Sequence, residues 1–181
     1  PYKGDLMGFF YFKKIYSLLP NAISALKTND IIEIPKFKPL ELNRVNGLLF
    51  AGQSYDYLMR DNDYLKLCLK AASLSKELGY NELFYKPHPL ERNRGGMKIF
   101  EELGFKILED RRPVEEIFLT EQLACVVSYN SSCLIHLKLL FGDDVRCVSY
   151  LNKVVSQYCN VKNAAVEMER IFNLCGVEYY E

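Results

Sequence analysis

The residues best suited to chemistry follow a short apolar run, in the stretch LFYKPHPLE that covers residues 83–91. His88 stands between Pro87 and Pro89, which restrict the backbone on both sides of it. Histidine titrates near neutral pH, so it can bind an anion or transfer a proton. With Lys86 two residues earlier, the stretch indicates a phosphate-binding loop. The alternative is a proline-punctuated turn whose charges face solvent.

A second segment suited to anions is SYNSSCLIH, residues 128–136. Ser131 and Ser132 are expected at the start of a helix, where hydroxyls, free N–H groups and the helix dipole favour a negative charge. Serine is also a preferred N-cap residue without any ligand, so this segment alone leaves both interpretations open. His136 follows one turn later among apolar neighbours, and we expect a packed or surface residue there.

Carboxylates complete the set of candidates. Glu115 follows Pro113 in the first turn of a predicted helix, where it can interact with the helix dipole or accept the two hydroxyls of a ribose. Asp56 and Asp61 lie in the loop after the first apolar strand, and either could act as a general base toward an acceptor hydroxyl. Asp63 is expected to be the N-cap of the helix that follows.

These candidates fall in loops because, from residue 46 onward, apolar runs typical of buried strands alternate with amphipathic segments that end at glycine. The predicted strands cover 47–52, 82–86, 105–108, 124–129 and 145–151, and the predicted helices cover 63–78, 97–103, 113–122, 131–142 and 164–175. Five strands alternating with helices indicate an α/β fold, a Rossmann-like parallel sheet with flanking helices. Ligands of such sheets bind beyond the carboxyl ends of the strands, where all the candidate loops lie.

The composition argues against several classes of protein. Lys plus Arg equals Asp plus Glu at 23 each, so no overall positive field attracts nucleic acid. Six cysteines are scattered without a CxxC pair or a metal-ligand cluster, so we expect reduced core thiols and no bound metal. We find no signal peptide and no apolar run long enough to span a bilayer.

Residues 1–45 differ from the rest of the chain. The aromatic, amphipathic segment 8–26 is predicted to be helical, and 31–39 reads as a short extended connection. We predict that 1–45 is the tail of an N-terminal domain with a linker, or a dimerisation segment, and that 46–181 is a nucleotide-sugar-binding domain. Since the chain begins with Pro1, we expect a fragment of a longer protein.

The order of three motifs resembles that of bacterial sialyltransferases. YKPHPLE and the later SYNSS resemble the HP motif and the paired-serine motif, and PVEEI between them resembles a Pro-x-Glu element that contacts the ribose of the CMP donor. The similarity covers roughly residues 46–176. It is nearest to the lipooligosaccharide and capsule sialyltransferases (glycosyltransferase family 52-like), with bacterial polysialyltransferases as near relatives.

This resemblance implies the C-terminal, donor-binding half of a glycosyltransferase B-type fold. The implied reaction is an inverting, metal-independent transfer of sialic acid from CMP-sialic acid to a hydroxyl of a bacterial lipooligosaccharide or capsule. His88 would bind the donor phosphate and act as general acid on the departing CMP. The same phosphate would contact Lys86, Ser131 and Ser132, while Glu115 would hold the ribose. No cofactor beyond the donor substrate is implied.

The chain departs from many relatives in lacking their Asp/Glu-Asp-Gly tripeptide, which keeps Asp56, Asp61 and Asp63 as candidate bases. The implied partners are CMP-sialic acid and a glycan acceptor, without nucleic acid, in a homodimer that is intertwined in some relatives. The implied location is the cytoplasm, with peripheral association at the inner face of the membrane as a variant. A donor-binding half alone is expected to be inactive. Two alternatives stay open: a B-type glycosyltransferase for nucleotide-diphosphate sugars, and a non-catalytic nucleotide-binding or assembly domain.

Overall fold

The computed structural model of the chain describes residues 15–17, 31–33, 45–150 and 162–180. The chain divides into two compact units, residues 1–38 and 39–181. In the first unit, β1 (Ile15–Ser17) pairs in parallel with β2 (Ile31–Glu33). The predicted helix is therefore wrong at 15–17, where β-branched and aromatic residues favour a strand. The rest of 8–26 lies outside the described residues.

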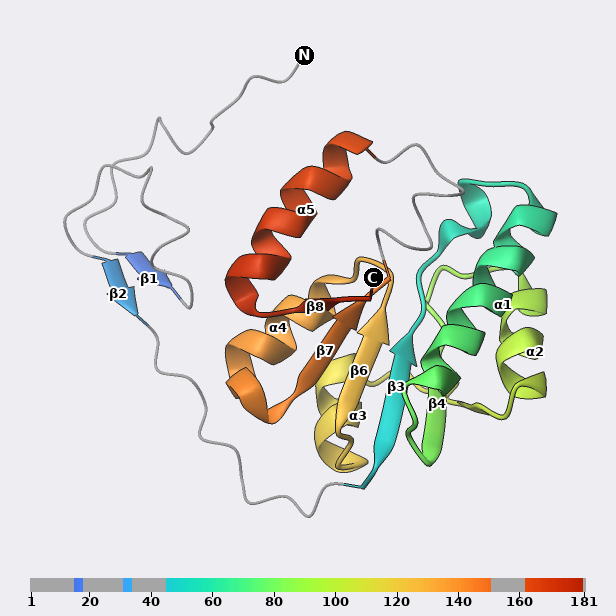
Figure 1. Cartoon of the computed structure of the whole chain (residues 1–181), viewed down its shortest axis with the longest axis horizontal. Helices are drawn as coiled ribbons and strands as arrows, with labels where there is room; N and C mark the ends of the chain where they lie inside the picture. The colour runs from blue at the N-terminus through green and yellow to red at the C-terminus, as the bar shows by residue number, and fades with distance from the viewer. Residues whose placement is uncertain (1–14, 18–30, 34–44, 151–161, 181) are drawn as a thin grey trace. The chain divides into compact units, whose positions relative to one another are not determined.

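The second unit contains a six-stranded, fully parallel sheet in the order β5-β4-β3-β6-β7-β8 (Figure 1). The chain starts at the centre, moves to one edge, returns to the centre and moves to the other edge, which is the Rossmann order. The predicted α/β class and Rossmann-like sheet are thus confirmed. The strands are β3 (Gly47–Ala51), β4 (Glu82–Lys86), β5 (Lys106–Ile107), β6 (Cys125–Ser128), β7 (Arg146–Ser149) and β8 (Glu178–Tyr179).

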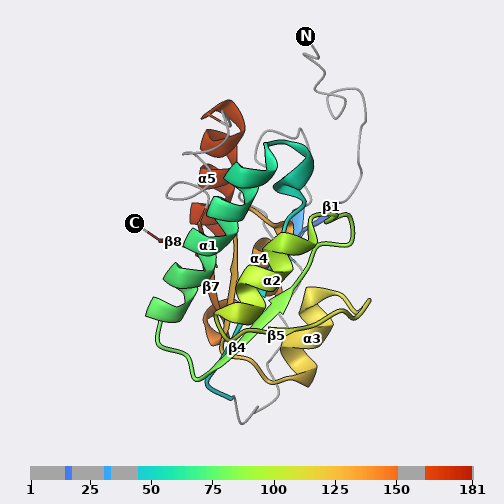
Figure 2. The same ribbon diagram turned by 90° about the vertical axis from the view of Figure 1, so that its right-hand side faces the viewer.

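Helices cover both faces of this sheet (Figure 2). One face packs against α1 (Asp61–Glu77) and α2 (Arg94–Glu102), and the other against α3 (Val114–Thr120), α4 (Ser132–Phe141) and α5 (Lys162–Cys175). Two short 3₁₀ turns, η3 (Tyr55–Tyr57) and η4 (Gly142–Asp144), follow β3 and α4. The glycines predicted to end helices, at positions 79, 104, 142 and 176, all have positive φ, as a residue without a Cβ allows.

Two predictions about these elements are wrong. The sheet has a sixth strand, because Glu178 and Tyr179 pair with the end of β7, and a two-residue strand carries no apolar run that would predict it. Asp63 is not the N-cap of α1, since the helix begins at Asp61 after Arg60. Asp63 lies in the first turn instead and accepts a hydrogen bond from Arg60 Nε at 3.0 Å.

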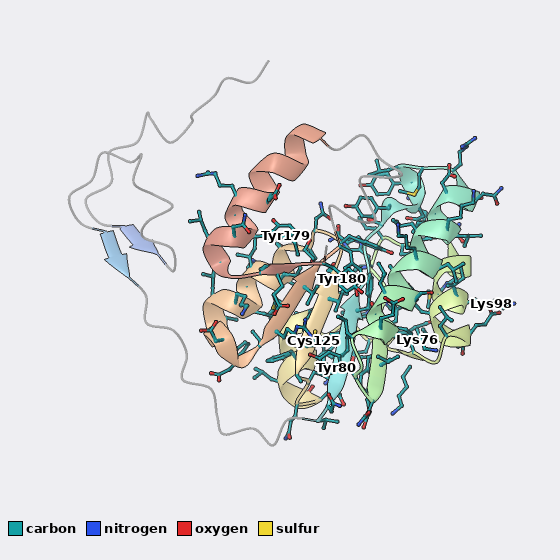
Figure 3. All side chains as sticks on the ribbon, viewed as in Figure 1. Lys76, Tyr80, Lys98, Cys125, Tyr179 and Tyr180 are labelled. Carbon is teal, nitrogen blue, oxygen red and sulfur yellow. The ribbon has the colours of Figure 1, made fainter. Side chains whose placement is uncertain are left out.

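Side chains of the central strand alternate between two cores, because successive residues of a strand face opposite sides of the sheet. Leu48 and Phe50 pack toward α1 and α2, and Leu49 and Ala51 pack toward α3 and α4. Figure 3 shows side chains filling both layers, while Lys76 and Lys98 point outward. A slip of one residue would exchange the two faces, so this burial fixes the register and the positions of the strand ends.

The cysteines in the described parts of the chain are free thiols, at positions 68, 125, 133, 147 and 175, while Cys159 lies outside those parts. Burial raises the pKa of the Cys68, Cys125 and Cys133 thiols to about 12, so they stay protonated at neutral pH. Within the same parts, no three His, Cys, Asp or Glu side chains are grouped to hold a metal ion. No helix described there is long and apolar enough to cross a membrane.

Candidate nucleotide-binding site

A cavity of about 720 Å³ opens at the carboxyl end of the sheet, between the loops that follow β4 and β5. Its volume is in the range of small-molecule sites. Four cationic side chains and three carboxylates contribute to its walls, so positive charges slightly exceed negative ones, which suits an anionic ligand. The lining consists of residues 86–89, Glu91, Arg94, Met97 and 108–114.

His88 lies half-buried in the cavity wall, within the loop of residues 87–93 that we call the HP loop. Its Nδ1 accepts a hydrogen bond from the Leu90 backbone N–H at 3.2 Å. The neutral ring therefore carries its proton on Nε2, which leaves that nitrogen as a donor. Burial lowers the pKa of His88, against the opposing effect of the Asp56 charge, so the ring is neutral at pH 7.

Lys86 is buried at the end of β4, with 8% of its surface exposed. Its Nζ donates to the Asp110 carbonyl at 2.7 Å and so ties the end of β4 to the loop after β5. This bond uses one of the three N–H donors of the ammonium group. The backbone N–H of Gly52 donates to the Lys86 carbonyl at 2.8 Å, which holds the end of β3 beside it.

Glu91 anchors the HP loop to the body of the domain. Its carboxylate accepts hydrogen bonds from the hydroxyls of Tyr64 at 2.7 Å and Tyr85 at 2.8 Å. It also accepts the backbone N–H of His88 at 3.2 Å. Sequence reasoning gave Glu91 no role. The available signal was its position three residues after His88, and nothing local identified the two tyrosines.

Asp56 and Asp61, two of the three aspartates predicted as candidate bases, both contact the far end of the HP loop. Asp56, in η3, accepts the backbone N–H groups of Arg92 at 2.6 Å and Asn93 at 2.9 Å with Oδ2. Its Oδ1 is buried and has no hydrogen-bond partner. Asp61 is exposed and accepts from Asn93 Nδ2 at 3.1 Å. Their role as general base stays a prediction.

The paired serines begin α4 as predicted. Ser131 is the N-cap, and its hydroxyl accepts from the Cys133 N–H at 3.4 Å, while Ser132 is exposed in the first turn. This helix end follows β6, and β3 is the one strand between β6 and β4. Two inter-strand spacings separate the ends of β4 and β6, which is roughly 10 Å. Neither serine lines the cavity beside His88.

Glu115 lies in the first turn of α3, next to the cavity residues Pro113 and Val114. Its Oε1 is 2.9 Å from Nδ1 of His136 on α4. His136 is exposed, as expected of a surface residue, but it also partners the predicted ribose-binding carboxylate. Because His136 lies one turn after Ser132, this pair brings Glu115 over the start of α4.

The family model of the alpha-2,8-polysialyltransferases (POLYST) matches residues 6–149 of this chain. The chain belongs to that family. The match includes the HP loop, Glu115 and both serines, and it confirms the resemblance to sialyltransferases. The chain is therefore of the glycosyltransferase class, with a nucleotide-sugar donor and a glycan acceptor. The matched family is the one that the motifs placed second to the lipooligosaccharide enzymes. A search of curated proteins gives no match.

In this member of the polysialyltransferase family, the point where the strand order reverses lies between β3 and β6. Rossmann-type sheets bind ligands in the crevice at that point. Here the Tyr55 hydroxyl donates to Asn130 Oδ1 at 2.6 Å and bridges the two loops. The cavity lies instead on the β4 side, where Lys86 and His88 meet the loop after β5.

Proposed function

We propose that this chain forms the donor-binding part of a sialyltransferase that uses CMP-sialic acid. The acceptor would be a hydroxyl of a bacterial surface glycan, a lipooligosaccharide or a capsule. The observation that carries the proposal is His88, a neutral histidine with one defined N–H donor, in the wall of a cavity that also contains Lys86, in a polysialyltransferase-family chain. Dimerisation, a cytoplasmic location and membrane association stay predictions from the resemblance.

In the proposed complex the phosphate of CMP lies over the end of β3, between His88 and the first turn of α4. The roughly 10 Å between the flanking strand ends leaves room for a phosphate with hydrogen bonds on both sides. β3 ends at Ala51 and Gly52 follows it, so neither residue places a large side chain at this strand end. The nucleoside would enter the cavity beside Lys86, and Glu115 would accept the ribose hydroxyls.

In the proposed reaction, the bond between the sialic acid anomeric carbon and the phosphate oxygen breaks, and CMP departs as a phosphate monoester. Negative charge grows on the phosphate, where the Nε2–H of His88, the serine hydroxyls and the N–H groups of α4 stabilise it. The acceptor hydroxyl attacks from the opposite side, which inverts the configuration. Because protein donors meet the developing charge, this mechanism uses no metal ion.

Asp61 is the general base that this geometry favours. A base must reach the proton of the acceptor hydroxyl, directly or through one water molecule. Asp56 has Oδ2 occupied by two backbone N–H groups, and its Oδ1 is buried. Asp61 is exposed at the first position of α1 and accepts a single hydrogen bond from Asn93.

A donor with a diphosphate is the alternative, because several arginines line the cavity. Two of them are already paired with carboxylates. Arg94 Nη1 contacts Glu109 at 2.8 Å, and Arg112 Nη2 contacts Asp110 at 2.6 Å. This pairing reduces the positive charge that a ligand meets, so it favours a monophosphate nucleotide such as CMP over UDP or GDP.

Calorimetric titration of the chain with CMP, UDP and GDP tests the proposed donor. We expect CMP to bind and the two diphosphates to bind at least tenfold more weakly, a difference of about 1.4 kcal/mol. Preferential binding of UDP or GDP would instead support a B-type glycosyltransferase that uses a nucleotide-diphosphate sugar. A folded chain that binds none of the three would contradict the proposed donor site.

The contact between His136 and Glu115 leads to a prediction about the ribose. His136→Ala should weaken CMP binding about fivefold, because one hydrogen bond of about 1 kcal/mol no longer orients the Glu115 carboxylate. The same substitution should reduce the affinity for 2′-deoxy-CMP less than the affinity for CMP, since 2′-deoxy-CMP lacks one ribose hydroxyl. The matched control is Glu116→Gln, which neutralises the exposed neighbouring carboxylate in the same turn. Equal losses for both ligands would show that this pair does not hold the ribose.

A further inference from the structure

The HP loop joins rigid elements of the fold through one carboxylate. Tyr64 comes from α1 and Tyr85 from β4, and each side chain is only 1% exposed. Both hydroxyls donate to Glu91, which in turn accepts the backbone N–H of His88. The HP loop is thereby fixed by hydrogen bonds to buried side chains of one helix and one strand. Support of this kind holds a catalytic side chain in position.

We propose that Glu91 is a positioning residue, which with Tyr64 and Tyr85 holds the HP loop so that Nε2 of His88 faces the donor phosphate. This inference rests on the proposed role of His88. Glu91 acts through the backbone of His88 and does not touch the reacting atoms. Asp56 contributes from outside by holding the other end of the loop at Arg92 and Asn93.

The protonation of Glu91 argues that its role is not simply to stabilise the fold. Burial raises the pKa of Glu91, although the hydrogen bonds from the tyrosines and His88 oppose this. A raised folded pKa means that the group contributes stability below its ordinary pKa and loses that contribution as pH rises through the raised value. The ionised carboxylate of Glu91 is therefore less favourable for folding than the protonated form.

The groups that face Glu91 do not remove this cost. Burial raises the pKa of the phenols and the thiol around it, so they remain neutral at pH 7, and the negative charge of Asp56 raises the Glu91 pKa further. The surrounding titratable groups are Tyr64 and Cys68 on α1, Tyr85 on β4, Asp56 on η3, Tyr129 after β6 and His88 in the loop. A carboxylate kept here at a cost to stability fits a role in positioning.

The titration of His88 by NMR tests the inference without any ligand. The chain has only two histidines, so His88→Ala assigns the signals. In Glu91→Ala we expect the pKa of His88 to rise toward its ordinary value of 6.5, because the released ring gains contact with water. Loss of the negative charge alone would lower that pKa, so the direction of the shift separates the two effects.

Three further measurements complete the test. CMP affinity should fall about tenfold or more in Glu91→Ala and less in Glu91→Gln, which retains an acceptor for the loop. Urea unfolding at pH 7 should show Glu91→Gln to be at least as stable as the wild type. The control Glu82→Gln lies at the opposite end of β4, in an exposed pair with Lys106, and should leave the His88 pKa and CMP affinity unchanged.

Two results would overturn the inference: an unchanged His88 pKa in Glu91→Ala, or a less stable Glu91→Gln with unchanged CMP affinity. If Glu91→Ala does not fold, Tyr85→Phe removes one anchor of the carboxylate and should shift the His88 pKa in the same upward direction. If the wild type fails to bind CMP, the proposed function fails, whereas the His88 titration still decides whether Glu91 positions the loop.

Discussion

His88→Ala is expected to reduce sialic acid transfer by about 10² to 10³-fold, the range typical for loss of one hydrogen-bond donor to a developing negative charge. The substitution removes the donor at Nε2 that is proposed to meet the charge on the departing CMP. It also removes the Nδ1 acceptor of the Leu90 N–H, so the HP loop loses an internal hydrogen bond. The measurement is the rate of transfer from CMP-sialic acid to a glycan acceptor by the full-length protein.

A second variant at this position tests the hydrogen-bond donor. His88→Gln keeps an N–H donor, so it should retain more CMP affinity and faster transfer than His88→Ala. The other histidine of the chain provides the reference, because His136→Ala should lower the transfer rate only a few-fold. Comparable transfer rates for His88→Ala and His136→Ala would contradict the proposed role of His88.

Local signals in the sequence were enough to predict the positions of these loops. The apolar run 124–129 became β6 because a strand buried on both faces needs no polar alternation. Ser131 became the N-cap of α4 because its side chain satisfies a free N–H of the first turn. Gly79 and Gly104 end α1 and α2 at positive φ, a conformation that depends on the residue itself.

The contacts that organise the site were not predictable because they join distant segments. Glu91 meets Tyr64 across 27 positions, and Asp56 meets Arg92 across 36. Their pairing depends on how α1 and η3 pack over the end of the sheet. Neither contact carries a pattern in any single segment, so sequence reasoning assigned Asp56 as a base and left Glu91 without a role.

Gly52→Ala is expected to destabilise the domain. It should also weaken CMP binding, because it disturbs the hydrogen bond from Tyr85 to Glu91 that anchors the HP loop. A Cβ at this position would lie 2.7 Å from the Tyr85 hydroxyl and 3.0 Å from the Lys86 carbonyl oxygen. The carbonyl belongs to the backbone of β4, which cannot move freely, so Tyr85 must shift away from Glu91. Overpacking of this kind costs about 1–3 kcal/mol in free energy of unfolding, which urea denaturation would measure.

The matched control is Gly47→Ala, at the opposite end of β3. Its Cβ would meet the flexible end of the Leu123 side chain at 2.9 Å, which can give way, so we expect a smaller loss of stability. Gly47 also lies at the amino end of the strand, away from the HP loop, so CMP affinity should not change. If Gly52→Ala and Gly47→Ala lost CMP affinity equally, the loss would come from lower overall stability and not from the hydrogen bond between Tyr85 and Glu91.

A double variant distinguishes the steric clash at position 52 from the loss of the hydrogen bond between Tyr85 and Glu91. Tyr85→Phe in the Gly52→Ala background removes the hydroxyl that the new Cβ would strike, so part of the stability should return. CMP affinity should stay low, because the phenylalanine cannot donate to Glu91. Gly96 makes the corresponding space for the other anchor, since a Cβ there would lie 2.8 Å from the Tyr64 hydroxyl. Two glycines thus leave room for the two hydroxyls that hold Glu91, and recovery of stability without recovery of binding is the result that this arrangement requires.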